Sequence, residues 1–314
     1  MRRRPLLALP FLAALPRAFA ATSAVYVPNE KSGTVTVIDP ARDEVVRELA
    51  VGGRPRGIAL SPDGSRLYLS DGARDALVVV AAADGRVQAT VKLGKSPEGL
   101  YRSSDGRWLA VAVEEDNAVA LVDARSLEVV ARIATEGRNP EHAVFSPDGR
   151  WLYVSAEDAS QVDVVDVAAR RQVGAIAVGR RPRGIAFAPD GRTAWVACEL
   201  DSGIHAIDVE RHAAVARLAG GEFCNGVCVS PDGRRVYVSN GRGASVSVVD
   251  AAERRIVGTV AVGQRPWNMA LATGGGRLYV ANGRSNSVSV VDTAALRKLR
   301  DISVGEAPWG AITG

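Results

Sequence analysis

Polar and apolar residues alternate over short segments along this chain, with the period of two that is typical of β-strands. In the stretch that begins at Tyr237, residues 245–249 read Ser-Val-Ser-Val-Val, and further apolar-rich runs occupy 256–262 and 267–271. Turn sequences such as Ser-Pro-Asp-Gly at 230–233 separate the runs, because proline presets a turn and glycine supplies the positive φ angle that closes a hairpin. The pattern therefore predicts an all-β chain made of units of four short strands.

This four-strand unit is repeated seven times. Equivalent positions recur with spacings of 42, 42, 43, 42, 42 and 42 residues, at Tyr26, Tyr68, Ala110, Tyr153, Trp195, Tyr237 and Tyr279. A period of 40–45 residues is that of one four-stranded propeller blade, and the 3.6-residue apolar pattern of helical repeats is missing. Composition does not change between the copies, so we expect residues 21–314 to form a single seven-bladed β-propeller domain.

The two ends of the chain predict how the ring closes. The last copy stops at Gly314, six residues short of a full unit, just after an apolar strand at 309–312. A strand able to complete it lies at 24–27, near the start of the chain. We expect these strands to pair within one blade, because ring closure removes the sheet edges that an open array leaves exposed. An open solenoid is the alternative.

The N-terminus has the pattern of an export signal. Three arginines at 2–4 precede a mostly apolar run at 5–16, and Ala18-Phe19-Ala20 follows as a small-x-small cleavage site. The apolar run is shorter than the roughly 20 residues that a membrane-spanning helix needs. We therefore expect residues 1–20 to be a signal peptide cleaved near Ala20, which makes the protein periplasmic or secreted. An uncleaved anchor is the alternative, and the choice between Sec and twin-arginine export stays open.

Removing this leader changes the charge of the protein. The full chain has 39 Lys and Arg against 35 Asp and Glu, but the leader contains four arginines and no acidic residue. The mature chain is thus balanced, which argues against a nucleic-acid partner, since such binding needs clustered excess cations. No later segment is apolar enough to span a membrane. We expect a protein or small-molecule partner.

The repeats resemble those of a known family. The patterns Tyr-Val-x-Asn, Val-x-Val-Val-Asp and Val-Gly-x-x-Pro are similar to the YVTN-type β-propeller repeat over nearly the whole mature chain. A narrower resemblance is to the propeller proteins associated with alcohol catabolism that depends on pyrroloquinoline quinone (PQQ), and it rests on the stretches 29–33, 54–58, 264–269 and 307–310. That group implies a periplasmic partner of a quinoprotein dehydrogenase and transport system, without assigned catalytic residues. The eight-bladed tryptophan-docking repeats of the dehydrogenases themselves are not present.

Residues that recur in most blades serve the scaffold, since a single binding site does not need seven copies. Six aspartates end the third strand of their units, where a carboxylate can accept hydrogen bonds from amides of the following turn: Asp39, Asp123, Asp166, Asp208, Asp250 and Asp292. They stand alone rather than in the oxygen-rich loop of a calcium site. We interpret them as structural.

The loop before each innermost strand differs from blade to blade. The position after its proline, or after the residue aligned with proline, is occupied by Arg56, Glu98, Glu141, Arg183, Asn225, Trp267 and Trp309. Such loops surround one mouth of the channel, and the loops after the second strands bring four carboxylates to the same face, from Glu30, Glu114, Glu157 and Glu199. Arginine forks bind carboxylates and tryptophan faces stack on planar rings. We expect this mouth to bind a partner, either an acidic planar ligand or a protein loop; a solvated rim that balances charge is the alternative.

One histidine lies at the same mouth. His142 occupies the position that is glycine in five other blades, at Gly57, Gly99, Gly184, Gly226 and Gly310. Beside Glu141 it could act as a general base or as an axial ligand to haem, or it could simply hydrogen-bond a neighbour. No Cys-x-x-Cys-His haem attachment site is present. The sequence therefore predicts no cofactor, and an association with PQQ or haem has no motif to support it.

The three cysteines allow one disulfide in an oxidising compartment. Cys224 and Cys228 lie along one strand about 13 Å apart, beyond the reach of a disulfide. Cys198 and Cys224 end and begin strands on the same face of neighbouring blades. We expect a Cys198–Cys224 disulfide with Cys228 free; three buried thiols are the alternative.

Three functions are compatible with this sequence. The first is a non-catalytic periplasmic binding or accessory module that presents the channel mouth to a dehydrogenase, a carrier or a small acidic ligand. The second is a lactonase-like hydrolase that uses Glu141 and His142, and it requires a metal or a base pair at the mouth. The third is a surface-layer structural protein, which should self-associate. Phosphate-binding loops, paired metal-ligand histidines and a serine nucleophile elbow are all missing, so no metal or catalytic residue is predicted.

Overall fold

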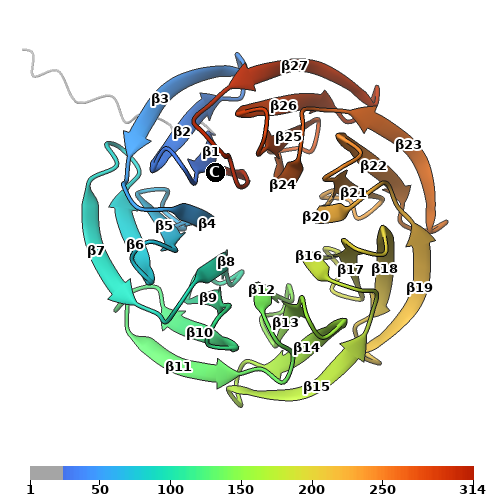
Figure 1. The fold of residues 1–314 in the computed structure, drawn as a ribbon, viewed down its shortest axis with the longest axis horizontal. Helices are drawn as coiled ribbons and strands as arrows, with labels where there is room; N and C mark the ends of the chain where they lie inside the picture. The colour runs from blue at the N-terminus through green and yellow to red at the C-terminus, as the bar shows by residue number, and fades with distance from the viewer. Residues whose placement is uncertain (1–23) are drawn as a thin grey trace, which may run out of the picture.

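The protein is a seven-bladed ring of β-sheets (Figure 1). A computed structural model describes residues 24–314, so the predicted signal peptide and its cleavage site lie outside the described residues. Within that range 28 strands form seven four-stranded antiparallel sheets and there are no helices. None of the described residues therefore belongs to a helix that could span a membrane. The predicted all-β, seven-bladed fold is confirmed.

The four strands of each sheet lie one after another from the centre of the ring to its rim. The innermost strands are β28 (Ile312–Thr313), β4 (Pro55–Leu60), β8 (Pro97–Arg102), β12 (Pro140–Phe145), β16 (Pro182–Phe187), β20 (Cys224–Val229) and β24 (Pro266–Leu271). The second strands are β1 (Val25–Asn29), β5 (Arg66–Asp71), β9 (Trp108–Val113), β13 (Trp151–Ala156), β17 (Thr193–Cys198), β21 (Arg235–Asn240) and β25 (Arg277–Asn282).

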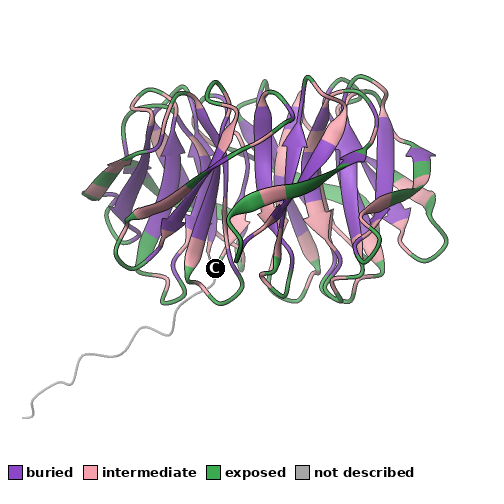
Figure 2. Cartoon of the chain, turned by 90° about the horizontal axis from the view of Figure 1, so that it is seen from below, coloured by how far each residue is buried: buried purple, intermediate pink, exposed green. Residues whose placement is uncertain are grey.

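Two further strands complete each blade. The third strands are β2 (Thr34–Asp39), β6 (Ala76–Ala81), β10 (Ala118–Asp123), β14 (Gln161–Asp166), β18 (Gly203–Asp208), β22 (Ser245–Asp250) and β26 (Ser287–Asp292). The outermost strands are β3 (Glu44–Ala50), β7 (Val87–Lys92), β11 (Val129–Ala134), β15 (Arg171–Ala177), β19 (Ala213–Ala219), β23 (Arg255–Ala261) and β27 (Arg297–Ser303). Figure 2 shows that the middle strands are buried, whereas the outermost strands and the loops are exposed.

The hydrophobic core lies between the blades. Seven clusters of buried side chains each join two neighbouring sheets; in one of them Tyr26 and Val35 of the first blade pack with Leu67, Leu69 and Val78 of the next. Each sheet is thus covered on both faces, which explains why strands such as β6 are buried at every position. Because every blade depends on two neighbours, the ring is a single packing unit.

The N- and C-terminal strands close the ring as the sequence predicts. β28 pairs with β1, with Ile312 opposite Tyr26, and the amide of Trp309 donates to the carbonyl of Pro28 at 3.0 Å. The regular ladder starts at Ile312 rather than at Trp309, because the register shifts by one residue between the Asn29–Pro308 bridge and Ile312. The first blade is therefore built from both ends of the described chain.

The repeated aspartates hold turns, as predicted. Asp39 Oδ1 accepts the amide of Ala41 at 2.8 Å, and Asp292 Oδ1 accepts that of Ala294 at 3.0 Å. Backbone hydrogen bonds of this kind lower the pKa of Asp250 and Asp292, so both carboxylates are ionised when they bind the turn.

The predicted Cys198–Cys224 disulfide is not formed, and all three cysteines are free thiols. Cys224 Sγ is directed into its own loop, where it contacts the carbonyl oxygen of Gly221 at 3.3 Å and lies 3.7 Å from Asn240 Oδ1. Burial raises the pKa of Cys198 and of Cys224 to about 12, so both stay protonated. The two cysteines lie on the same face of neighbouring blades, as expected, but their sulfur atoms do not point toward each other.

Candidate binding site at the channel mouth

In each blade the register shifts directly after the proline that leads into the innermost strand, or after Cys224 in its place, and this β-bulge builds the mouth of the channel. In β12, Pro140 pairs with Ala156, but the next regular pair is Ala143 with Val154, so the register shifts across Glu141 and His142. The same shift occurs in the other blades, for example between Pro55 and Ile58. A bulge leaves a residue unpaired and re-aims its side chain. The seven predicted mouth positions lie in these bulges.

The channel is narrow just beyond the bulges. A Cβ added to Gly57 would lie 2.4 Å from the backbone nitrogen of Leu100, and one added to Gly226 would lie 2.4 Å from the carbonyl oxygen of Trp267. Neighbouring innermost strands therefore touch through their backbones at this level, which explains the repeated glycine. Only two blades place a longer side chain there, His142 in β12 and Asn268 in β24.

Above this constriction lies a cavity of about 220 Å³, which we call the mouth pocket. Its lining combines carboxylates, guanidinium groups and aromatic rings: Glu30, Arg56, Glu98, Glu114, Glu141, Glu157, Arg181, Arg183, Asn225, Trp267, Asn268 and Trp309. The structure thus brings together every residue predicted at the mouth except His142 and Glu199. Both tryptophans are partly exposed.

Arg183 is the centre of the charge network in this pocket. Its Nη1 lies 2.9 Å from Glu141 Oε1 and also pairs with Glu157, while its Nε lies 3.1 Å from Glu199 Oε2. Only 12% of the Arg183 side chain is exposed. Although burial opposes its charge, these carboxylates hold the pKa of Arg183 above its usual value.

The other arginines of the mouth are paired as well. Arg56 forms ion pairs with Glu30, at 3.1 Å, and with Glu98. Arg181 lies 3.1 Å from a Glu157 oxygen, and Arg265 lies 2.7 Å from Glu199 Oε1. The guanidinium forks that we expected to bind a ligand therefore face protein carboxylates, and a ligand carboxylate would have to displace one of them.

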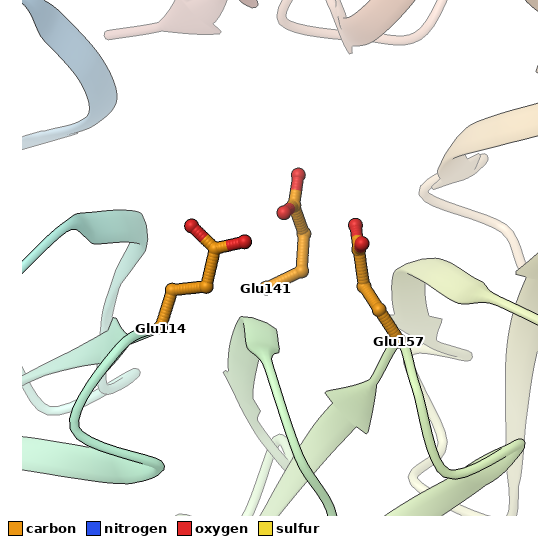
Figure 3. Close-up of side chains that lie close together, drawn as sticks. All are labelled: Glu114, Glu141 and Glu157. Carbon is orange, nitrogen blue, oxygen red and sulfur yellow. The ribbon is translucent and has the colours of Figure 1, made fainter.

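Three carboxylates converge at one side of the pocket, where Glu114, Glu141 and Glu157 have oxygen atoms within 4.8 Å of one another (Figure 3). Burial and the repulsion of Glu141 raise the pKa of Glu157 to about 8, whereas Arg183 holds the pKa of Glu141 below its usual value against the effect of burial. Glu141 and Glu157 therefore share one proton at neutral pH. Carboxylates this close resemble part of a calcium site, but Arg183 and the shared proton together already neutralise two of them.

His142 lies behind the pocket rather than in its lining. The ring is fully buried, its Nδ1 lies 2.8 Å from the Tyr101 hydroxyl, and its centroid lies 5.5 Å from that of Trp309. Burial lowers the pKa of His142 to about 4, so the imidazole is neutral. Its position and partner make it a support for Trp309, and Glu141 turns away from it to Arg183.

Sequence reasoning missed the part played by the residue before the proline. Arg181 and Arg265 occupy this position with φ angles of 57° and 54°, and Arg54 occupies it in the second blade and pairs with Glu30. An arginine at the same place in three repeats was a signal that the sequence contained.

Fold and site together define a seven-bladed β-propeller whose channel opens through a charged mouth with two tryptophans. Residues 7–314 match the model of the YNCE-like beta-propeller family, and the chain belongs to this family. The broader resemblance to propeller repeats is thereby confirmed. No curated protein matches the chain.

Many solved structures share the fold, including the two that follow. Hydrazine synthase of Kuenenia stuttgartiensis has a TM-score of 0.73 and 21% sequence identity, with 82% of this chain and 88% of that chain covered. A functionally unknown protein from Desulfotomaculum acetoxidans has a TM-score of 0.80 and 15% identity, with 92% and 98% covered. At such identities the similarity concerns the fold alone.

Proposed function

We propose that this protein is an exported, non-catalytic binding module that docks a protein partner on its mouth pocket. The observation that carries the proposal is the composition of the pocket: its ion pairs are satisfied internally, while Trp267 and Trp309 stay partly exposed beside them. Tryptophan and arginine are the residue types most enriched among interface hot spots. A rigid rim with exposed aromatic anchors suits a protein loop better than a small acidic ligand, which would have to break an existing ion pair.

A hydrolase is the weaker candidate. It was expected to use Glu141 and His142, but Glu141 forms an ion pair with Arg183, and His142 is buried against Tyr101. A general base has to reach the proton that it removes from the substrate. With these contacts Glu141 and His142 stabilise the wall of the pocket, and we propose no catalytic role for them.

The nature of the partner follows from the narrower family resemblance. We propose a periplasmic quinoprotein alcohol dehydrogenase, or a carrier that works with it, as the partner. Two of the four stretches that resemble the PQQ-associated propellers, 264–269 and 307–310, contain Trp267 and Trp309. The residues that carry the resemblance therefore line the same pocket. Cleavage near Ala20 and delivery to the periplasm are part of this proposal.

Replacing Trp267 by Ala is expected to weaken partner binding by about 2 kcal/mol, or roughly thirtyfold, while the fold stays intact. Trp309→Ala should have a similar effect on binding. The mature protein is immobilised, exposed to periplasmic extract from alcohol-grown cells of the source organism, and the captured proteins are quantified by mass spectrometry. Binding of the purified partner is then measured by calorimetry, after thermal unfolding has shown equal stability of the variants.

Trp108→Ala is the matched control. Trp108 is also partly exposed, but it starts β9 at the opposite face of the ring, beneath the guanidinium of Arg107. Its replacement should leave capture unchanged. Equal capture by Trp267→Ala and wild type would reject the mouth as the docking surface. Mouth-dependent capture of a protein without a quinone cofactor would keep the surface and reject the quinoprotein partner.

A further inference from the structure

The channel has a second cavity on the other side of the constriction. It measures about 600 Å³ and is lined by residues from all seven innermost strands, together with Ser104, Ser146 and Pro147 of the Ser-x-Asp-Gly and Ser-Pro-Asp-Gly turns. It therefore opens at the face opposite the mouth pocket, and we call it the turn-face chamber. Asn268 and Trp309 line both cavities, and the Asn268 amide donates to the Trp309 carbonyl at 3.3 Å. These two residues form the partition.

The walls of the turn-face chamber are apolar, in contrast to the mouth pocket. They include aliphatic and aromatic side chains from every side of the ring: Ile58, Leu100, Phe145, Phe187, Met269 and Ile312. The polar groups near the partition are uncharged. The Tyr101 hydroxyl is bonded to His142, and burial raises the pKa of the Cys228 thiol to about 12. Cavities of this size with largely apolar walls and a few polar groups are typical of small-molecule sites.

Arg102 is the one charged residue in the lining of this chamber. Its Nη1 donates to the carbonyl of Ser103 at 3.3 Å, and among residues 24–314 no carboxylate lies within ion-pair distance of its guanidinium. The arginines of the mouth pocket, by contrast, all have carboxylate partners. The carboxylate of the turn that follows Arg102, that of Asp105, accepts hydrogen bonds from the Ser103 hydroxyl at 2.5 Å and from the amide of Arg107.

The repeat also marks Arg102 as an exception. Five residues after the proline, or its equivalent, the other six blades have Leu60, Phe145, Phe187, Val229, Leu271 and Thr313. A scaffold that accepts leucine, phenylalanine or valine at this position has no structural need for an arginine. An unpaired cation at the rim of an apolar chamber favours an anionic group of a ligand, because a guanidinium binds a carboxylate through two parallel hydrogen bonds.

We infer that the turn-face chamber is a binding site for an amphipathic monocarboxylate. The carboxylate binds Arg102 at the open end, and the apolar chain lies among the side chains of the seven innermost strands toward the Asn268–Trp309 partition. This site is independent of the proposed docking surface, which lies at the other end of the channel. Occupancy of the chamber leaves the mouth pocket free.

Decanoate is the probe, and isothermal titration calorimetry is the measurement. We expect wild type to bind one decanoate, and Arg102→Gln to bind it about tenfold more weakly because a charge-assisted contact is lost. Binding of 1-decanol, which has the same chain without the charge, should be equal in the two proteins. Arg107→Gln is the matched control: Arg107 is exposed on the same hairpin but does not line the chamber.

A second measurement uses the wild-type protein alone. Cys228 lines the chamber and is partly exposed, whereas Cys198 and Cys224 are fully buried. Saturating decanoate should therefore slow the reaction of Cys228 with a methanethiosulfonate reagent several-fold. The inference is overturned if decanoate gives no saturable binding, if Arg102→Gln binds it as tightly as wild type, or if Cys228 reacts at the same rate with and without decanoate.

Discussion

A chain that ends at Glu306 should lose the stability of the whole ring rather than that of one blade. Removing residues 307–314 deletes β28 and the backbone hydrogen bonds that join Ala24, Glu30 and Pro28 to the C-terminal segment. About five such bonds at about 1 kcal/mol each suggest a loss of roughly 5 kcal/mol. For a chain of this size we expect the unfolding temperature to fall by about 10 °C or more.

The measurement is thermal unfolding of the mature protein with and without residues 307–314. A chain that lacks only Gly314 keeps Ile312 opposite Tyr26 but loses both hydrogen bonds between Ala24 and Gly314, so it should unfold at a temperature between those of the full and the truncated chains. Cooperative unfolding at a lower temperature is expected, since every blade is packed between two others. An unchanged unfolding temperature after the larger deletion would show that ring closure contributes nothing to stability.

Replacing Arg183 by Met should destabilise the protein by about 3–5 kcal/mol at neutral pH, because it leaves buried carboxylates without their counter-charge. Glu141, Glu157 and Glu199 all pair with this guanidinium. Without it, the pKa of Glu141 in the folded state rises above that in the unfolded chain, and the pKa of Glu157, which burial already raises to about 8, rises further. Folding then takes up protons, so the loss of stability should shrink as the pH falls from 8 to 5.

Urea unfolding of Arg183→Met at pH 8 and pH 5 tests this expectation. Arg180→Met is the matched control, because Arg180 pairs with Asp201 through a side chain that is 69% exposed, and exposed pairs contribute about 1 kcal/mol or less. If the two variants have the same free energy of unfolding at pH 8, the ion pairs of the mouth pocket are as weak as surface pairs.

The fold could be predicted because the sequence pattern of one propeller blade is repeated seven times along the chain. The spacing between Tyr237 and Tyr279 equals the length of one blade, and the piece missing after Gly314 is found at 24–27. What the repeat does not contain is the pairing register. The bulge after Pro140 changes the direction of the Glu141 side chain without changing the length of the strand. The pattern of apolar residues therefore cannot reveal the bulge.

The candidate site was predictable in position but not in contacts. Aligned repeats place equivalent residues at the same height of the channel, and for that reason Arg56 and Trp267 both line the mouth pocket. Aligned repeats do not show in which direction a side chain points. Consecutive residues of a bulge diverge, so Glu141 meets Arg183 of the next blade while His142 meets Tyr101 of the preceding one. The pairing of Arg183 with three carboxylates depends on such directions.

The central claim is that the mouth pocket is the docking surface, and hydrogen–deuterium exchange of the complex with the captured partner tests it most directly. We expect slower exchange in the loops at 264–268 and 305–309 and in those around Glu114 and Glu157, which surround the pocket. Exchange in the opposite turns at 103–106, 146–149 and 230–233 should be unchanged. Protection confined to those turns, with none at the mouth, would contradict the account.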